Sequence, residues 1–177
     1  MSARADDLQR QLDEIEAIEA ITGVAPEWNT SALDIETLRA IASGDSDAVC
    51  DACLDLTLIV PVGEDSEKPP CRLRVILPAS YPSIITPTVA SCSLAQLETT
   101  ALNAVLSDRV SSFIADGADD YAGDEMLFAI VQAATDAAES LLAQQGEEQA
   151  AASAAAAARQ AKPVVSREEP EHCQGGG

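Results

Sequence analysis

Apolar side chains near the start of the chain recur every three or four residues, which is the spacing of a helix with one buried face. The members of this stripe are Leu8, Leu12, Ile15, Ile18 and Ile21. Acidic residues occupy the remaining positions, and a glycine at 23 followed by a proline at 26 provides a stop signal. The pattern predicts an amphipathic helix that ends near residue 22.

The period changes to two in residues 54–60 and again in residues 71–77, which is typical of strands with one buried face. The polar residues 63–70 between them suit a turn. Asp55 on one strand and Arg72 and Arg74 on the other occupy the polar positions. Opposite charges on neighbouring strands favour an antiparallel hairpin with one solvated face.

Shorter patterns flank this hairpin. Residues 25–30 can form a short strand, and residues 35–41 suggest a short helix that ends at Gly44. The prolines between residues 78 and 87 exclude a helix there, and residues 88–90 can form a further short strand. Ser93 and Gln96 have the spacing of a capping box, which predicts that the next helix opens at Ser93.

Two helices close the predicted domain. The first has an apolar stripe made of Leu94, Leu97, Leu102, Leu106, Val110 and Phe113. After an acidic segment bracketed by glycines, the second has Leu127, Ile130, Val131, Ala134, Ala138 and Leu141 at helical spacing. Strands that run together between helices indicate an α+β fold: an N-terminal helix, an antiparallel sheet of three to four strands, and two C-terminal helices.

The character of the chain changes after residue 145. Residues 149–161 are mostly alanine, which favours a helical extension but provides no large side chain for a core. The last residues are polar and end in three glycines. We therefore expect a domain over residues 5–145 and an alanine-rich, disordered tail over residues 146–177.

The charge balance limits the possible partners. The chain has 10 Lys and Arg residues against 30 Asp and Glu residues, a formal net charge of −20. Such a chain repels phosphate groups, so neither nucleic acid nor an anionic membrane is an expected partner. There is no secretory signal at the N-terminus and no apolar run near the ~20 residues needed to span a bilayer. The expected location is the cytoplasm, and the nucleus is the second expected location.

Three features of the sequence resemble the RWD domain family. The first helix carries Leu12-x-x-Ile15-Glu16-Ala17-Ile18-x-x-Ile21, the second predicted strand of the hairpin is followed by Tyr81-Pro82 and Pro87, and two helices close the domain. The resemblance implies a fold similar to that of ubiquitin-conjugating enzymes. It also implies structural roles for Ile15, Glu16, Ile18, Tyr81, Pro82 and Pro87.

The resemblance implies a domain without catalytic activity. Ubiquitin-conjugating enzymes carry an H-P-N motif and an active cysteine after the Tyr-Pro segment. This sequence has no H-P-N motif, and its single histidine is His172 in the tail. Cys92 is the only cysteine between Pro87 and Asp124, and it follows the motif too closely. We therefore do not expect an enzyme.

The cysteines are the main candidates for other chemistry. Cys50 and Cys53 form a C-x-x-C pair, and Cys71 and Cys92 could complete a zinc site. A second closely spaced pair of ligands is missing, so we favour free thiols and expect no metal. Phosphate-binding glycine motifs are also absent, so we expect no cofactor and no small-molecule substrate.

The interpretation that the sequence favours is a protein-interaction module, an adaptor or regulator in translation control or in ubiquitin-related pathways. The alternatives are the N-terminal part of a RING-type ubiquitin ligase whose catalytic region is missing, and a cysteine-based zinc-binding module. The candidate contacts with a protein partner are Arg72 and Arg74 on the sheet, and Trp28, since Trp and Arg are enriched at interface hot spots.

Overall fold

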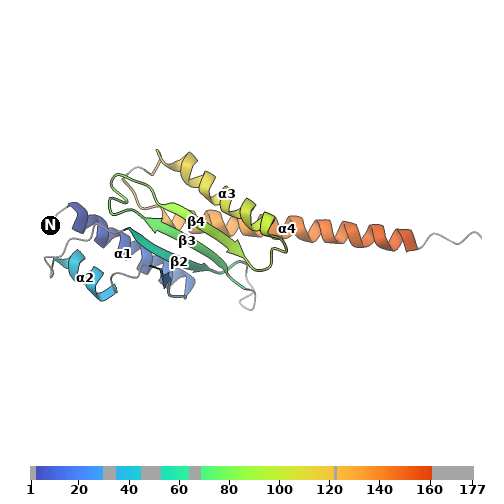
Figure 1. Cartoon of the computed structure of the whole chain (residues 1–177), viewed down its shortest axis with the longest axis horizontal. Coiled ribbons are helices and arrows are strands. Elements are labelled where there is room, and N and C mark those ends of the chain that lie inside the picture. The colour runs from blue at the N-terminus through green and yellow to red at the C-terminus, as the bar shows by residue number, and fades with distance from the viewer. Residues whose placement is uncertain (1–2, 30–34, 45–52, 64–68, 122, 161–177) are drawn as a thin grey trace, which may run out of the picture. The chain divides into compact units, whose positions relative to one another are not determined.

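The sheet and helices follow one another in the order that the sequence predicts. The computed structural model describes residues 3–29, 35–44, 53–63, 69–121 and 123–160. Its elements, shown in Figure 1, are α1 (Ala3–Thr22), β1 (Glu27–Trp28), α2 (Ile35–Ser43), β2 (Leu54–Val60), β3 (Cys71–Leu77), β4 (Thr88–Leu94), α3 (Thr100–Gly117) and α4 (Leu127–Gln160). The predicted α+β class with an antiparallel sheet is confirmed.

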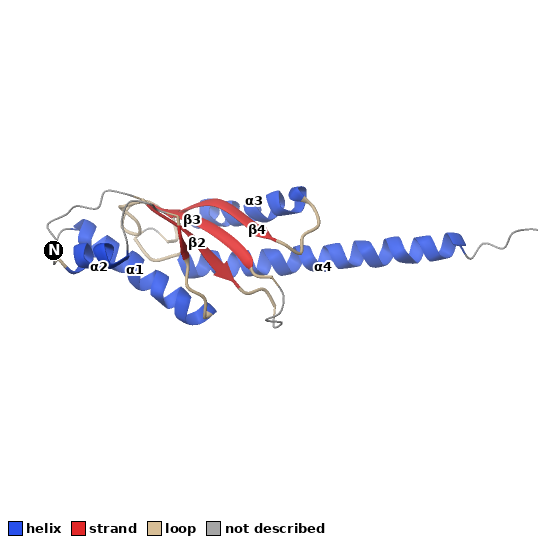
Figure 2. Ribbon diagram, turned by 60° about the horizontal axis from the view of Figure 1, so that its bottom comes forward, coloured by secondary structure: helices blue, strands red, loops and turns tan. Residues whose placement is uncertain are grey.

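The four strands form an antiparallel sheet in which each strand pairs with the next one along the chain, in the order β1-β2-β3-β4. Figure 2 shows β2, β3 and β4 side by side in this order. Along the central pair, Leu54 lies opposite Leu77 and Thr57 lies opposite Arg74. This register puts the apolar positions of both strands on one side of the sheet and the charged positions on the other. The predicted hairpin is therefore present with the residue limits that the alternating pattern indicated.

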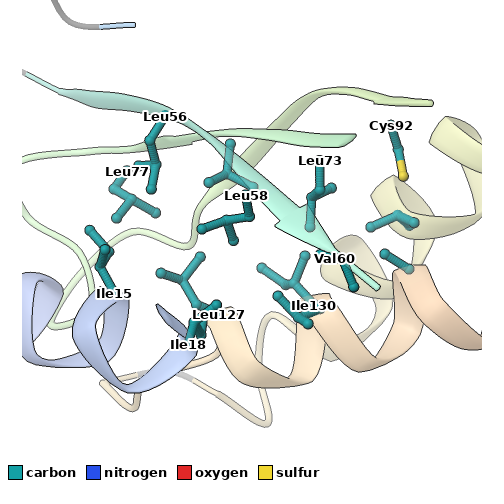
Figure 3. Packing of buried hydrophobic residues seen from close by; sticks show 14 of the residues in the cluster. Ile15, Ile18, Leu56, Leu58, Val60, Leu73, Leu77, Cys92, Leu127 and Ile130 are labelled. Atoms are coloured by element: carbon teal, nitrogen blue, oxygen red, sulfur yellow. The ribbon is translucent and has the colours of Figure 1, made fainter. Parts of the chain in front are cut away.

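The core lies between the apolar side of the sheet and the helices α1 and α4. Figure 3 shows Ile15 and Ile18 of α1 and Leu127 of α4 pointing toward Leu56 and Leu58 of β2. All five side chains are at most 3% exposed. Burying one such side chain contributes roughly 1.5–3 kcal/mol. The apolar stripes that the sequence shows for the first and last helices therefore face the core, except at Ile21, the last member of the first stripe, which is 65% exposed.

The predicted start of the third helix is wrong. Ser93 belongs to β4, which runs on to Leu94, and α3 begins only after its N-cap Thr99, whose hydroxyl accepts a hydrogen bond from the backbone N–H of Leu102. The reason is burial: Cys92 and Leu94 alternate with exposed serines and face the core, opposite Leu73 and Cys71 of β3. A period of two over these residues therefore prevails over the local capping pattern.

The alanine-rich segment is helical as far as Gln160, at the end of α4. The chain separates into two units, residues 1–144 and 145–177, so α4 begins in the first unit and ends in the second. Residues 146–159 have exposed side chains, and alanine forms helix without needing core contacts. This helix differs from the disorder expected for residues 146–177, whereas residues 161–177 lie outside the described residues.

Candidate functional site

The Tyr81-Pro82 segment lies in the loop between β3 and β4, and it turns back toward α1. The peptide bond between Tyr81 and Pro82 is cis, and the backbone N–H of Ile84 donates to the carbonyl of Ser80. Tyr81 is 1% exposed, and Pro82 and Pro87 are buried. The loop therefore places an aromatic ring with a polar end inside the domain.

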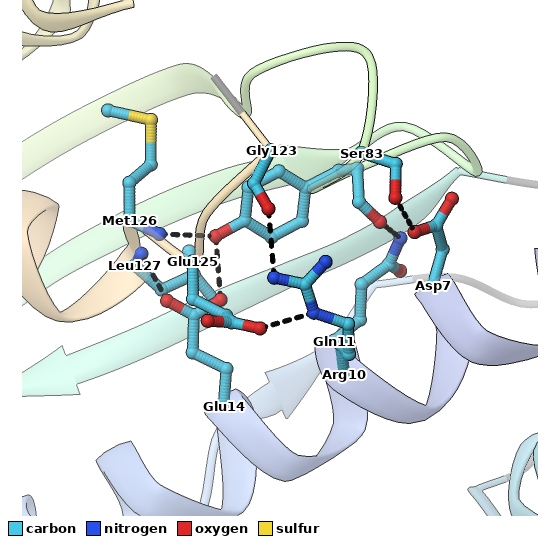
Figure 4. A network of polar contacts seen from close by, with 10 residues as sticks. Asp7, Arg10, Gln11, Glu14, Ser83, Gly123, Glu125, Met126 and Leu127 are labelled. Carbon is cyan, nitrogen blue, oxygen red and sulfur yellow. Dashed lines mark hydrogen bonds and ion pairs between the residues drawn. The ribbon is translucent and has the colours of Figure 1, made fainter. Parts of the chain in front are cut away.

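Glu14 and the Tyr81 hydroxyl form the centre of a buried polar network (Figure 4). The hydroxyl donates to Oε2 of Glu14 over 2.6 Å and accepts from the backbone N–H of Met126 over 2.6 Å. The other carboxyl oxygen of Glu14 accepts from the backbone N–H of Leu127. These bonds satisfy two N–H groups at the start of α4, which the helix itself leaves without partners.

A second set of bonds extends this network along α1. The amide of Gln11 donates to the carbonyls of Pro78 and Tyr81, over 2.9 Å and 2.7 Å, and the Ser83 hydroxyl donates to Asp7. Figure 4 shows the side chains of Asp7 and Gln11 reaching from α1 toward the loop that contains Ser83.

Arg10 joins α1 to the residues that precede α4. Its guanidinium forms an ion pair with Glu125 and donates to the carbonyl of Gly123 over 2.9 Å. The backbone of Gly123 has a φ of 88°, which residues with a side chain rarely adopt. Three segments that are distant in the sequence are therefore fixed to one another: α1, the Tyr81-Pro82 loop and the beginning of α4.

Burial dominates the titration of this network. It raises the pKa of Glu14, although hydrogen bonds from Tyr81 and from the backbone at the start of α4 act in the opposite direction. Burial and the nearby Glu14 carboxyl both raise the pKa of Tyr81 well above its usual range. A tyrosine hydroxyl and a carboxyl enclosed in this way suit a structural junction rather than proton exchange with a substrate.

The remaining residues of the predicted structural motif divide between core and surface. Ile15 and Ile18 are buried in the core. Glu16 is exposed instead and forms an ion pair of 2.6 Å with Arg39, which is on α2. Glu16 thus connects the first two helices and has no place in the Tyr81 network.

Arg72 and Arg74 lie on the polar side of the sheet, and each is engaged by a carboxylate of another strand: Asp55 of the adjacent β2 for Arg74, and Glu27 of β1, across β2, for Arg72. Arg74 forms two bonds with Asp55 of β2, at 2.9 Å and 2.6 Å, and Arg72 forms a similar two-bond contact with Glu27 of β1. Hydrogen bonds from the guanidinium groups lower the pKa of both carboxyls. We call these four residues the sheet-face ion pairs; the arginines remain about half exposed.

Trp28 ends β1, next to Glu27 of the sheet-face ion pairs. It is half-buried, lies opposite the buried Leu56 of β2 and packs against the core, so its side chain is on the apolar side of the sheet. Asn29, the next residue, donates to the Thr57 hydroxyl over 2.9 Å. The structure therefore separates the three candidate contact residues: Arg72 and Arg74 are accessible on the polar side of the sheet, whereas Trp28 packs on the apolar side.

The cysteines do not assemble into a metal site among the described residues. The Sγ atoms of Cys71 and Cys92 lie 3.4 Å apart in the core, whereas Cys53 is exposed, and Cys50 lies outside the described residues. The described part of the chain contains no group of three or more His, Cys, Asp or Glu residues positioned for a metal. The hydrogen bond from Cys71 and burial both raise the pKa of Cys92, which disfavours a thiolate there, whereas the hydrogen bond with Cys92 lowers the pKa of Cys71.

Sequence reasoning missed Asp7, Gln11 and Glu14, three polar residues that α1 buries. A signal was present, because they repeat at steps of four and three, the same spacing as the apolar stripe beside them. Their partners were not predictable from this spacing, since Tyr81 and Leu127 are 67 and 113 residues away from Glu14.

The arrangement defines an α+β domain with one covered and one open sheet face, tied together by a Tyr-Pro loop. The family model of the RWD domain matches residues 9–138, well over half of the chain, so the chain belongs to the RWD domain family. RWD domains are protein-interaction modules with the fold of ubiquitin-conjugating enzymes, and they are generally non-catalytic. The comparison with curated proteins found no match. Within the described residues, no helix is long and apolar enough to cross a bilayer.

Proposed function

We propose that this RWD chain is an adaptor or regulator that binds a protein partner through the open face of its sheet. The observation that supports it best is the pair of exposed arginines, Arg72 and Arg74, held side by side on β3 by Glu27 and Asp55. Side chains fixed in this way lose little freedom when a partner binds, which favours binding. Arginine is also the charged residue most often found at interface hot spots.

The pathway part of the proposal rests on the family resemblance alone: translation control or a ubiquitin-related pathway. The cytoplasm, with the nucleus as a second location, is proposed from the odd number of cysteines and their irregular spacing, which suit reduced thiols. Glu14 and Tyr81 are assigned no catalytic role, because both are buried in the junction between helices. Nucleic acid is not proposed as a partner, given the net charge of −20.

The test is a pull-down with the full chain, followed by mass spectrometry of the recovered proteins. The wild type is compared with Arg72→Glu/Arg74→Glu and with Arg109→Glu, a single charge reversal at an exposed position of α3. We expect a specific partner to be recovered by the wild type and by Arg109→Glu, and to be lost with the double variant. Recovery by all three forms would contradict binding through the sheet face.

A second pair of variants separates lost binding from lost structure. Arg72→Glu/Glu27→Arg and Arg74→Glu/Asp55→Arg exchange the partners of each ion pair, so each pair can still form across the strands. If the partner recognises the arginines at positions 72 and 74, both charge-swap variants also lose the partner. They should still unfold at nearly the same urea concentration as the wild type. Restored binding in the exchanged forms would mean that the pairs only support the sheet.

A further inference from the structure

Three of the chain's few aromatic residues meet at one hollow on the surface. The whole chain contains one Trp, two Tyr and two Phe. Phe113 of α3, Tyr121 from the segment after it, and Phe128 of α4 line a hollow of about 420 Å³. The rings of Phe113 and Tyr121 are 6.4 Å apart and tilted by 55°, a favourable aromatic arrangement. We call this hollow the aromatic groove.

Phe128 is the least expected member of the groove. It follows Met126 and Leu127, which are 1% and 0% exposed, yet its own side chain is 53% exposed. The groove floor continues with the small residues Ala129 and Ala133 of α4, which leave room beside the ring. A large aromatic side chain left open next to a hollow of this kind is a usual property of interaction sites.

Acidic side chains outnumber basic ones around the aromatic groove, although Arg109, one helical turn before Phe113, lies near it and donates a hydrogen bond to Ser140, one turn after Asp136. Asp136 lines it, and its carboxylate accepts a hydrogen bond of 2.9 Å from Gln132. None of the described residues that line the groove is basic. Asp119 and Asp120, which precede Tyr121 in the chain, are exposed and add to the negative charge. An occupant with positive charge would be attracted to this region.

We propose that the aromatic groove binds a basic segment of a partner protein, with an apolar side chain between the three rings and an Arg or Lys next to Asp136. Cations also bind favourably over aromatic faces, so the rings and the carboxylate select the same kind of segment. A second copy of the chain would bring a further charge of −20 to an already negative surface. The inference rests on the role as an interaction module, but it does not depend on the sheet-face contact.

The test uses a phage-displayed library of random dodecapeptides selected against the full chain. We expect enriched peptides that combine Arg or Lys with a large apolar residue. Synthetic, fluorescein-labelled copies of them are then titrated with the protein, and fluorescence anisotropy gives the Kd. Phe128→Ala is expected to raise the Kd at least tenfold. Asp136→Asn is expected to raise it several-fold and to weaken its dependence on salt.

Two controls make the result specific. Val105→Ala removes a similarly exposed apolar side chain from α3, outside the groove, and leaves the Kd unchanged. Arg72→Glu/Arg74→Glu should also leave the Kd of the peptide unchanged. Binding at the aromatic groove can therefore be confirmed even if binding through the sheet face is contradicted, and the sheet-face proposal can likewise hold if the groove proposal fails. Urea unfolding checks that Phe128→Ala is folded.

Four results would overturn the inference. One is that no related peptides are enriched on the wild type. Another is that the enriched peptides are acidic, or that they bind Phe128→Ala as tightly as the wild type. The last is a wild-type dimer in sedimentation velocity that Phe128→Ala converts to a monomer, which would assign the groove to a second copy.

Discussion

Two clusters of polar residues in this domain use similar chemistry in opposite surroundings. Around Tyr81, the side chains of Gln11 and Glu14 make their bonds inside the protein. On the open side of the sheet, the ion pairs of Arg72 and Arg74 are made in contact with water. The buried cluster is closed to other molecules, whereas the sheet-face residues are paired but remain accessible to water and to another protein.

The buried cluster is suited to stabilising the fold, and the sheet-face ion pairs are suited to binding a partner. A buried donor or acceptor that loses its partner costs about 1–3 kcal/mol, because water cannot replace that partner. Exposed ion pairs contribute little, since water solvates the separated charges nearly as well. We therefore expect substitutions around Tyr81 to unfold the domain and substitutions at the sheet face to change binding while the fold persists.

The largest effect is expected from Tyr81→Ala, which empties the centre of the buried cluster. Removing a buried aromatic side chain costs about 3–5 kcal/mol, and Glu14 and the N–H of Met126 lose a partner as well. Urea unfolding followed by circular dichroism measures this loss. Ile84→Ala, in the same loop but 80% exposed, is the matched control and should leave the midpoint unchanged. Equal midpoints for both variants would mean that the loop is not part of the core.

A smaller loss is expected from Tyr81→Phe, which keeps the ring and removes only the hydroxyl. The Glu14 carboxyl then lacks one donor and the N–H of Met126 lacks its acceptor, so the free energy of unfolding falls by about 1–3 kcal/mol. Tyr121→Phe makes the same chemical change at a half-buried ring and should have a clearly smaller effect. A similar loss of stability in both variants would show that the hydrogen bonds of the Tyr81 hydroxyl do not stabilise the fold more than an ordinary tyrosine hydroxyl does.

The pH dependence of stability gives a third test, based on the raised pKa of Glu14. A carboxyl whose pKa is higher in the folded state stabilises the fold below its unfolded value, near 4.5, and this contribution is lost as pH rises through the folded pKa. The stability of the wild type relative to Glu14→Gln should therefore fall as pH rises above 4.5. Unfolding in urea across pH 4 to 8 measures the difference. A difference that increases with pH would contradict burial as the dominant cause.

The smallest effect on stability is expected at the sheet face. Arg74→Gln and Asp55→Asn, alone and together, form a double-mutant cycle whose coupling should be far below the Tyr81→Phe loss and should shrink in high salt. Thermal unfolding at low and high salt measures it. A coupling free energy as large as the loss of stability in Tyr81→Phe would mean that the Arg74–Asp55 pair stabilises the fold as strongly as the buried cluster. The contrast between the two clusters would then not hold.

The sequence predicted what local periodicity encodes. The alternation in residues 54–60 and 71–77 is regular, and the hairpin forms within those limits. The error at Ser93 came from a capping pattern four residues long, which was weaker than the alternation of Cys92 and Leu94 toward the core. The two local signals were in conflict there, and the contacts with β3 decide between them.

The candidate sites divide in the same way. The arginines on β3 could be assigned to the solvated side of the sheet from their spacing alone. The pairing of Glu14 with Tyr81 and the meeting of Phe113, Tyr121 and Phe128 depend on how α1, α3 and α4 pack. No pattern within one element contains that information, because the residues involved belong to different elements.

The hydrogen bond between Glu14 and the N–H of Leu127 spans 113 residues, and it bears on how the protein is made. During translation, α1 leaves the ribosome first, while the backbone groups that its polar side chains require are synthesised near the end of the domain. Contacts between distant parts of a chain form late, and apolar surface stays exposed until they do. The Glu14 carboxyl of α1 therefore lacks one of its hydrogen-bond donors until the start of α4 has emerged, and the junction around Tyr81 is completed only at that point.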